Sequence, residues 1–217
     1  MTRDWHLEVG LAERGDTKGL DRLLTLADGV FAIAITILVL DLRVPPGLIG
    51  RELPAHIADL IPEFISYGIS FAVIAIYWQA QREVFEDIES SDAALTWMTF
   101  LFLMAIAFLP FPTLLLGEYR DQQISVIFYA ADAAVASLLL VGISWYARSG
   151  HRLVPEDIDE EQARLRTAQG LAVPVVFLAS IVISFWSPEI ALYSWLLLIV
   201  TDPLVGWAWR RARRSSS

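Results

Sequence analysis

The chain has 217 residues, of which 56% are hydrophobic, and its formal net charge is −9. This apolar share exceeds the roughly 45–50% of an ordinary soluble domain. The absence of cysteine excludes disulfides, thiolate metal sites and cysteine nucleophiles. The apolar residues form long blocks with almost all the charge between them, which is typical of membrane-spanning helices.

Six apolar blocks predict an all-α polytopic membrane protein with six transmembrane helices in a single domain over residues 1–217. The predicted helices cover about 20–42, 57–82, 93–117, 124–148, 168–186 and 190–209. Each block is apolar on consecutive residues, which excludes the alternating strands of a membrane barrel. The connection at 149–167 is the longest, and we expect a solvated linker there.

The basic residues indicate an orientation in the lipid bilayer. If the N-terminus is cytoplasmic, the cytoplasmic segments hold all but three of the 16 Lys and Arg residues. The three exceptions are Arg43, Arg51 and Arg120. Because Lys and Arg concentrate on the cytoplasmic side of membrane proteins, we expect a multi-pass protein of the cell membrane with both termini in the cytoplasm.

The sequence carries none of the familiar enzyme patterns. Its three histidines form no metal-spacing pair, and no Walker glycine loop, GxSxG or HExxH pattern is present. We therefore expect no enzyme activity, no cofactor and no nucleic-acid partner. The carboxylates within or beside the spans are Asp28, Glu63, Asp132 and Asp202. Ionisable groups in membrane helices are costly, so each is a functional candidate or a structural anchor between helices.

The first span presents a regular stripe of side chains. At about 100° per residue, Ile33, Ile37 and Leu40 fall on one side with Thr36 beside them, and Asp28 falls roughly opposite. Such a stripe is common in ordinary helix packing. Repeated around an axis, it would instead form apolar rings that gate a pore by dewetting, with a threonine ring that offers oxygen to a partly dehydrated cation.

The run Arg22-Leu-Leu-Thr-Leu-Ala-Asp-Gly-Val-Phe-Ala-Ile-Ala-Ile-Thr36 resembles the opening signature of the transmembrane protein 175 family of potassium channels, in its prokaryotic branch. Ile76-Tyr77-Trp78, the run 109–113 and the run 116–119 are also similar to the family. The resemblance covers most of the chain through the fourth block and is weak beyond it. It implies a homotetramer of six-helix subunits, in which the first helix of each subunit lines a central pore for potassium ions.

The resemblance also assigns roles by position. Ile33, Ile37 and Leu40 match the apolar pore constrictions of the family, and Thr36 matches the threonine ring linked to potassium preference. The implied activity is passive, potassium-preferring cation conduction. A proton- or cation-coupled secondary transporter is the alternative, because Asp132 lies in the fourth block, where a carboxylate can bind a proton or an ion.

Two departures from the family concern a polar network that holds its helices together. The family's Phe-Ser-Asp is here Leu26-Ala27-Asp28, and a histidine pair after Trp78 is here Gln81 and Arg82. We expect the network in this chain to comprise Arg22, Asp28, Trp78, Gln81 and Arg82. An unpaired buried carboxylate is costly, so we hypothesise that Arg82 or Arg22 pairs with Asp28.

Overall fold

The computed structural model describes residues 5–119, 121–149, 153–155 and 160–195, and every regular element in these ranges is a helix. The predicted all-α class is confirmed. The elements are α1 (Trp5–Ile37), the 3-10 turn η1 (Leu38–Asp41), α2 (Glu52–Asp59), α3 (Ile61–Glu86), α4 (Ala93–Phe108), α5 (Pro110–Glu118), α6 (Gln123–Arg148), α7 (Glu160–Ser184) and α8 (Pro188–Ser194).

Four helical segments of the described residues are long and apolar enough to cross a bilayer, so the chain is a multi-pass membrane protein. They are Lys18–Asp41, Ile61–Glu86, Ala93–Glu118 and Gln123–Arg148. At 1.5 Å per residue, about 20 residues span the hydrocarbon core, and each segment has at least 24. Gly170–Ser184 within α7 is a shorter apolar helix. Most of the predicted sixth helix, 190–209, lies outside the described residues.

The helices in the structure begin or end at other residues than predicted in several places. α1 begins at Trp5 rather than near residue 20, because no proline interrupts the polar stretch before the span. The predicted helix at 57–82 is divided into α2 and α3, with Pro62 in the first turn of α3. Pro110 interrupts the next helix only at Leu109, between α4 and α5, since proline lacks the N–H that would continue it. Ala93–Glu118 is still a single apolar span, in agreement with the predicted helix 93–117. α7 begins at Glu160, so part of the predicted linker is helical.

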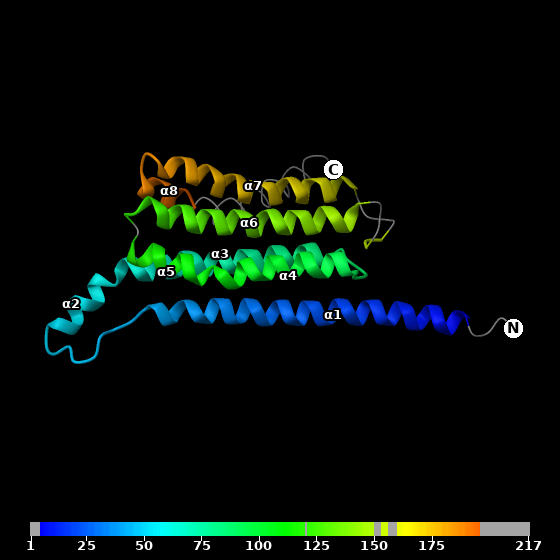
Figure 1. The fold of residues 1–217 in the computed structure, drawn as a ribbon, viewed down its shortest axis with the longest axis horizontal. Coiled ribbons are helices and arrows are strands. Elements are labelled where there is room, and N and C mark those ends of the chain that lie inside the picture. Colours follow the sequence, from blue (N-terminus) through cyan, green and yellow to red (C-terminus); the bar gives the residue numbers. More distant parts are fainter. Residues whose placement is uncertain (1–4, 120, 150–152, 156–159, 196–217) are drawn as a thin grey trace, which may run out of the picture.

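The helices stack in layers (Figure 1). α1 forms one outer layer against α3 and α4; α6 packs on α4, and α7 and α8 cover α6 on the far side. The loop after η1 and the short helix α2 project beyond the bundle. Two glycines in this loop, Gly47 and Gly50, have φ of 92° and 63°, a conformation that is open to glycine without the steric cost of a Cβ. Because α3 and α4 pack against one side of α1, that side is covered by the subunit and the opposite side is uncovered.

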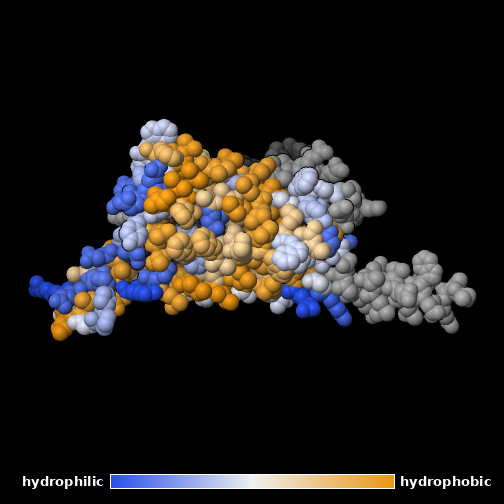
Figure 2. All heavy atoms as spheres, in the orientation of Figure 1, coloured by the Kyte–Doolittle hydropathy of each residue, from blue (hydrophilic) through white to orange (hydrophobic). Residues whose placement is uncertain are grey.

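The surface of the bundle fits a lipid environment. Figure 2 shows apolar residues gathered in a band over the middle of the molecule, with hydrophilic residues at its two ends. Large exposed side chains such as Trp97, Met104 and Trp145 belong to spanning helices. A soluble monomer rarely exposes so large an apolar patch, whereas a lipid bilayer solvates it.

Aromatic and hydroxyl side chains connect the layers. Phe102 of α4 contacts Phe31 of α1 and Tyr77 of α3, with ring centroids 6.0 and 6.3 Å apart. The Tyr77 hydroxyl donates to the backbone oxygen of Ala133 and lies 2.8 Å from the Ser137 oxygen on α6. Further out, Tyr129 of α6 stacks on Trp195 at 4.6 Å. The middle layer is thereby fixed to both neighbours.

Replacing Tyr77 with Phe removes the hydroxyl that joins α3 to α6. Hydrogen bonds between membrane helices contribute about 0.6 to 2 kcal/mol, and Ser137 still donates to the Ala133 oxygen at 2.9 Å. We therefore expect stability to fall by about 1 kcal/mol, measured as a lower thermal unfolding midpoint in detergent. Tyr119→Phe, at the exposed end of α5, is the matched control. An equal loss in both variants would contradict the assignment.

Candidate functional site on the first membrane helix

α1 turns one side toward the subunit interior. The residues that are buried on this side recur every three or four positions, as expected for one face of a helix. They are Leu20, Leu23, Ala27, Phe31, Ala34 and Leu38. Phe31 packs against Phe102 of α4. This buried face is what attaches α1 to α3 and α4.

The predicted stripe lies on a different side of α1. Ile33 and Ile37 of α1 and Leu40 of the following η1 are 60%, 41% and 62% exposed in the subunit. On α1, Ile33 and Ile37 lie about 120° and about 80° around the helix from the centre of the buried face. Large branched side chains on this side therefore make little contribution to the packing of their own subunit. The stripe is directed outward, toward whatever lies beside α1 in the membrane.

Thr36 is exposed beside this stripe, and its hydroxyl is bonded to its own helix. Its Oγ1 lies 2.9 Å from the Ala32 backbone oxygen and 3.0 Å from that of Ile33, so the proton is donated inward. A hydroxyl has one proton and two acceptor lone pairs. With the proton directed at the helix, the lone pairs of the Thr36 oxygen are left for an external donor or cation.

Asp28 is held by a residue other than the arginines expected. The Trp78 indole Nε1 donates to the Asp28 Oδ1 at 2.8 Å, which joins α3 to α1. Arg82 instead forms a salt bridge with Glu86, one turn further along α3, at 3.2 Å. The hypothesis that Arg82 or Arg22 pairs with Asp28 therefore differs from what the structure shows. Trp78 was expected in the network, but not as the direct partner of Asp28.

The remaining members of the expected network are dispersed. Gln81 is 2% exposed, and within the part of the chain that the structure describes its Nε2 has no hydrogen-bond partner. Arg22 lies at the exposed surface of α1. The structure therefore joins Asp28 to Trp78 directly, whereas Arg22, Gln81 and Arg82 make no hydrogen bond or ion pair with Asp28 in the part of the chain that is described.

The other carboxylates singled out in the sequence lie on different parts of the chain and form no cluster among the described residues. Asp132 lies on α6, which packs on α4 and α7, and its Oδ2 is buried without a partner among the described residues. Glu63 lies in the first turn of α3, and its Oε2 is likewise buried without a hydrogen-bond partner among the described residues. Asp202 is outside the described residues. No three His, Asp or Glu residues of the described ranges are placed to hold a metal ion.

A second polar cluster, which the sequence interpretation missed, closes one end of the bundle. Arg148, the last residue of α6, contacts Asp87 at 3.2 Å. Asp92 accepts from the Leu95 N–H at 2.8 Å and from the Tyr146 hydroxyl at 2.6 Å. The position of Asp92 just before an apolar run is the signal that could have revealed it, since aspartate is a favoured helix N-cap. The cluster fixes the turn between α3 and α4 against the end of α6.

The chain matches known proteins along most of its length. The sequence model of the family described as endosomal/lysosomal potassium channel TMEM175 matches residues 22–110. A relative from Streptomyces collinus named as a potassium channel is 35% identical over 152 residues, which cover 66% of this chain and 71% of that protein. One from Chamaesiphon minutus, also named as a potassium channel, is 29% identical over 182 residues, covering 82% and 90%.

The fold is also similar to that of a solved structure. The crystal structure of a lysosomal potassium-selective channel TMEM175 homolog from Chamaesiphon minutus matches with a TM-score of 0.77 and 27% identity, over 86% of this chain and 97% of the other. These relatives are channels and not enzymes, so this chain is not an enzyme either. The signature on α1, the outward stripe and these matches agree: the chain belongs to the prokaryotic TMEM175 channel family.

Proposed function

We propose that this chain is a potassium-preferring cation channel that conducts passively through a central pore lined by α1. The observation that carries the proposal is the outward stripe of Ile33, Ile37 and Leu40, which the subunit leaves uncovered. Its relatives are named potassium channels, which supports the choice of ion. Four copies of α1 around an axis would turn the stripe into stacked apolar rings.

Each ring has a physical role in this proposal. Rings of Ile33, Ile37 and Leu40 form the constrictions, where a narrow apolar passage resists wetting and so limits conduction. The Thr36 ring presents the lone pairs that its inward-directed hydroxyl leaves available. Four such oxygens replace part of the hydration shell of a potassium ion. Asp28 and Trp78 hold α1 against α3 and so set the orientation of the stripe.

The proposed subunit has six spans in one domain over residues 1–217 and assembles as a homotetramer in the cell membrane, with both termini in the cytoplasm. The four long helices, the apolar part of α7 and the apolar block at 190–209 support the count of six. The concentration of Lys and Arg on one side supports the orientation.

A proton- or cation-coupled secondary transporter is the second candidate, and Asp132 with its unpartnered buried oxygen is the observation that favours it. The two functions differ in a direct measurement. In a channel, potassium flows down its own gradient, and the flux needs no second ion. In a transporter, the flux saturates with substrate concentration and depends on a proton or cation gradient.

Thr36→Ala is expected to lower the potassium over sodium preference several-fold, because it removes the hydroxyl oxygen beside the constrictions. Thr36→Ser keeps that oxygen and is the matched control. The measurement is potassium and sodium flux in liposomes that contain the purified protein and no energy source. Absence of passive potassium flux in the unaltered protein would overturn the channel proposal. Equal selectivity in the Ala and Ser variants would overturn the role of Thr36.

A further inference from the structure

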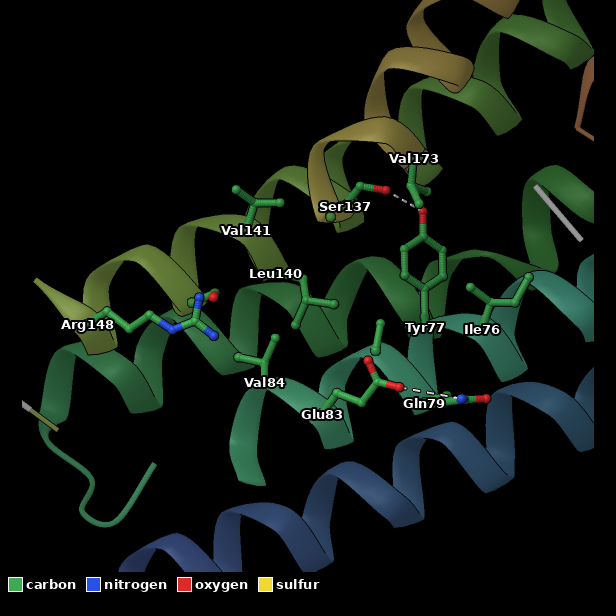
Figure 3. A pocket seen from close by; sticks show the side chains of 13 residues that line it. Ile76, Tyr77, Gln79, Glu83, Val84, Ser137, Leu140, Val141, Arg148 and Val173 are labelled. Carbon is green, nitrogen blue, oxygen red and sulfur yellow. Dashed lines mark hydrogen bonds between the residues drawn. The ribbon is translucent and has the colours of Figure 1, made fainter. Parts of the chain in front are cut away.

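A cavity of about 120 Å³ lies between α3, α6 and α7, apart from the candidate pore helix. Figure 3 shows its wall: side chains of α3 face those of α6, and α7 contributes Val173. Gln79 and Glu83 are exposed, and Ile76 and Val84 are half-buried, so the cavity opens onto the surface of the bundle. About 10–15 Å³ of such space holds one water molecule, so this cavity has room for a chain of several heavy atoms.

The lining combines charged and apolar side chains. Arg148 stands at one end, Glu83 lies on α3 beyond Val84 and Leu140, and Val173 is at the other end, near Tyr77 (Figure 3). Arg148 is the last residue of α6, and Glu83 lies three residues before the end of α3. Both charged residues are therefore in the last turn of a membrane span, where lipid head groups lie, and Leu140 and Val141, about two turns before the end of α6, are at the depth of acyl chains.

These two charges favour a particular kind of head group. Arg148 is paired with Asp87 at 3.2 Å, and Glu83 contacts Gln79 Nε2 at the long distance of 3.5 Å. Among the described residues that line the cavity, Glu83 supplies a carboxylate and Arg148 a guanidinium, so this lining carries one charge of each sign. A ligand with both an ammonium and a phosphate matches this set, because the ammonium can donate to Glu83 and the phosphate can accept from Arg148.

We propose that this cavity binds a phospholipid with a zwitterionic, primary-amine head group of the ethanolamine type, with one acyl chain against Leu140, Val141 and Val173. A choline head group cannot donate N–H bonds to Glu83, and a glycerol head group carries no positive charge. Ethanolamine lipid therefore binds more tightly than lipids with either of those head groups and the same acyl chains. The site is independent of whether α1 conducts.

Such a lipid would contact the helix that holds α1. Ile76, Ala80 and Glu83 of α3 line the cavity, whereas Trp78 of the same helix reaches Asp28 on α1. In these contacts among the described residues, α3 alone lies between the lipid and the proposed pore helix α1. A bound lipid stiffens α3 on the side opposite its bond to α1.

The test is native mass spectrometry of delipidated protein in detergent, titrated with ethanolamine, choline and glycerol phospholipids of identical acyl chains. We expect the ethanolamine lipid to bind about tenfold more tightly than the other two. Glu83→Gln should remove that preference. Glu86→Gln, exposed on the same helix and paired with Arg82 outside the cavity, should keep it.

A second variant tests the place of the acyl chain. Ala80→Phe puts a ring into the half-buried cavity wall, and it should reduce ethanolamine lipid binding at least tenfold, whatever the head-group preference. Equal binding of all three lipids, unchanged preference in Glu83→Gln or unchanged affinity in Ala80→Phe would each overturn the proposal. Absence of lipid binding in the unaltered protein, as when another segment or copy of the chain fills the cavity, would do the same.

Discussion

Replacing Ile37 with Asn is expected to raise potassium flux on the order of tenfold, which corresponds to a barrier lower by about 1.4 kcal/mol. The cause is the wetting of an apolar constriction: an amide side chain holds water where the branched chain of Ile37 excludes it. The buried face of α1 consists of other residues, so the substitution leaves the contacts with α3 and α4 in place. Ile33 and Leu40 remain as constrictions in series, and they limit the gain.

The measurement is single-channel conductance in planar bilayers, with liposome flux beside it. Val135→Asn is the matched control, because Val135 is exposed on α6, a helix that packs on α4 and α7. We expect it to leave conductance unchanged. An equal rise in both variants would indicate a general leak. Unchanged conductance in Ile37→Asn would contradict the proposal that α1 lines the pore.

Replacing Trp78 with Phe is expected to lower stability by about 1–2 kcal/mol and to reduce the fraction of protein in the proposed tetramer. Phe keeps most of the ring but lacks the N–H that reaches Asp28 at 2.8 Å. Hydrogen bonds to charged groups contribute about 1.5–3 kcal/mol. The lower part of that range applies here, because Trp78 is 38% exposed and water can replace part of the bond.

A double-mutant cycle isolates this bond from the other contacts of the ring. Stability and tetramer fraction are measured for Trp78→Phe, Asp28→Ala and the pair, by thermal unfolding and size-exclusion chromatography. If the bond joins the helices, the double variant loses less than the sum of the single losses. Strict additivity would show that the two residues act separately. Asp28→Asn keeps an acceptor oxygen and should fall between the unaltered protein and Asp28→Ala.

The membrane class and four of the spans could be predicted from hydropathy alone, because an apolar block of some 20 residues has few alternatives to a spanning helix. Hydropathy does not register the short interruptions before Pro62 and Pro110, because they arise from the missing N–H of proline and not from a change in polarity. The stripe on α1 was also readable, since helical spacing separates Ile33 and Ile37 from Phe31 and Ala34 without any tertiary information.

The partner of Asp28 could not be read from the sequence in the same way. Charge alone favours an arginine, but Arg82 has Glu86 within one turn of its own helix, a pairing that i,i+4 spacing supports. Trp78 and Asp28 are 50 residues apart in the sequence, and they meet only because α1 and α3 pack against each other. The cavity at Glu83 and Arg148 was unpredictable for the same reason, since it belongs to three helices at once.

The bond between Asp28 and Trp78 has a consequence for the order of biosynthesis. The chain emerges from the ribosome N-terminus first, so Asp28 meets the membrane before its donor has been made. An aspartate near the centre of an inserting helix costs about 2.5–3.5 kcal/mol, which the apolar run that follows Asp28 has to offset alone. α1 is thus translated before the helix that anchors it, and its bond to Trp78 can form only once the next hydrophobic segment has been made.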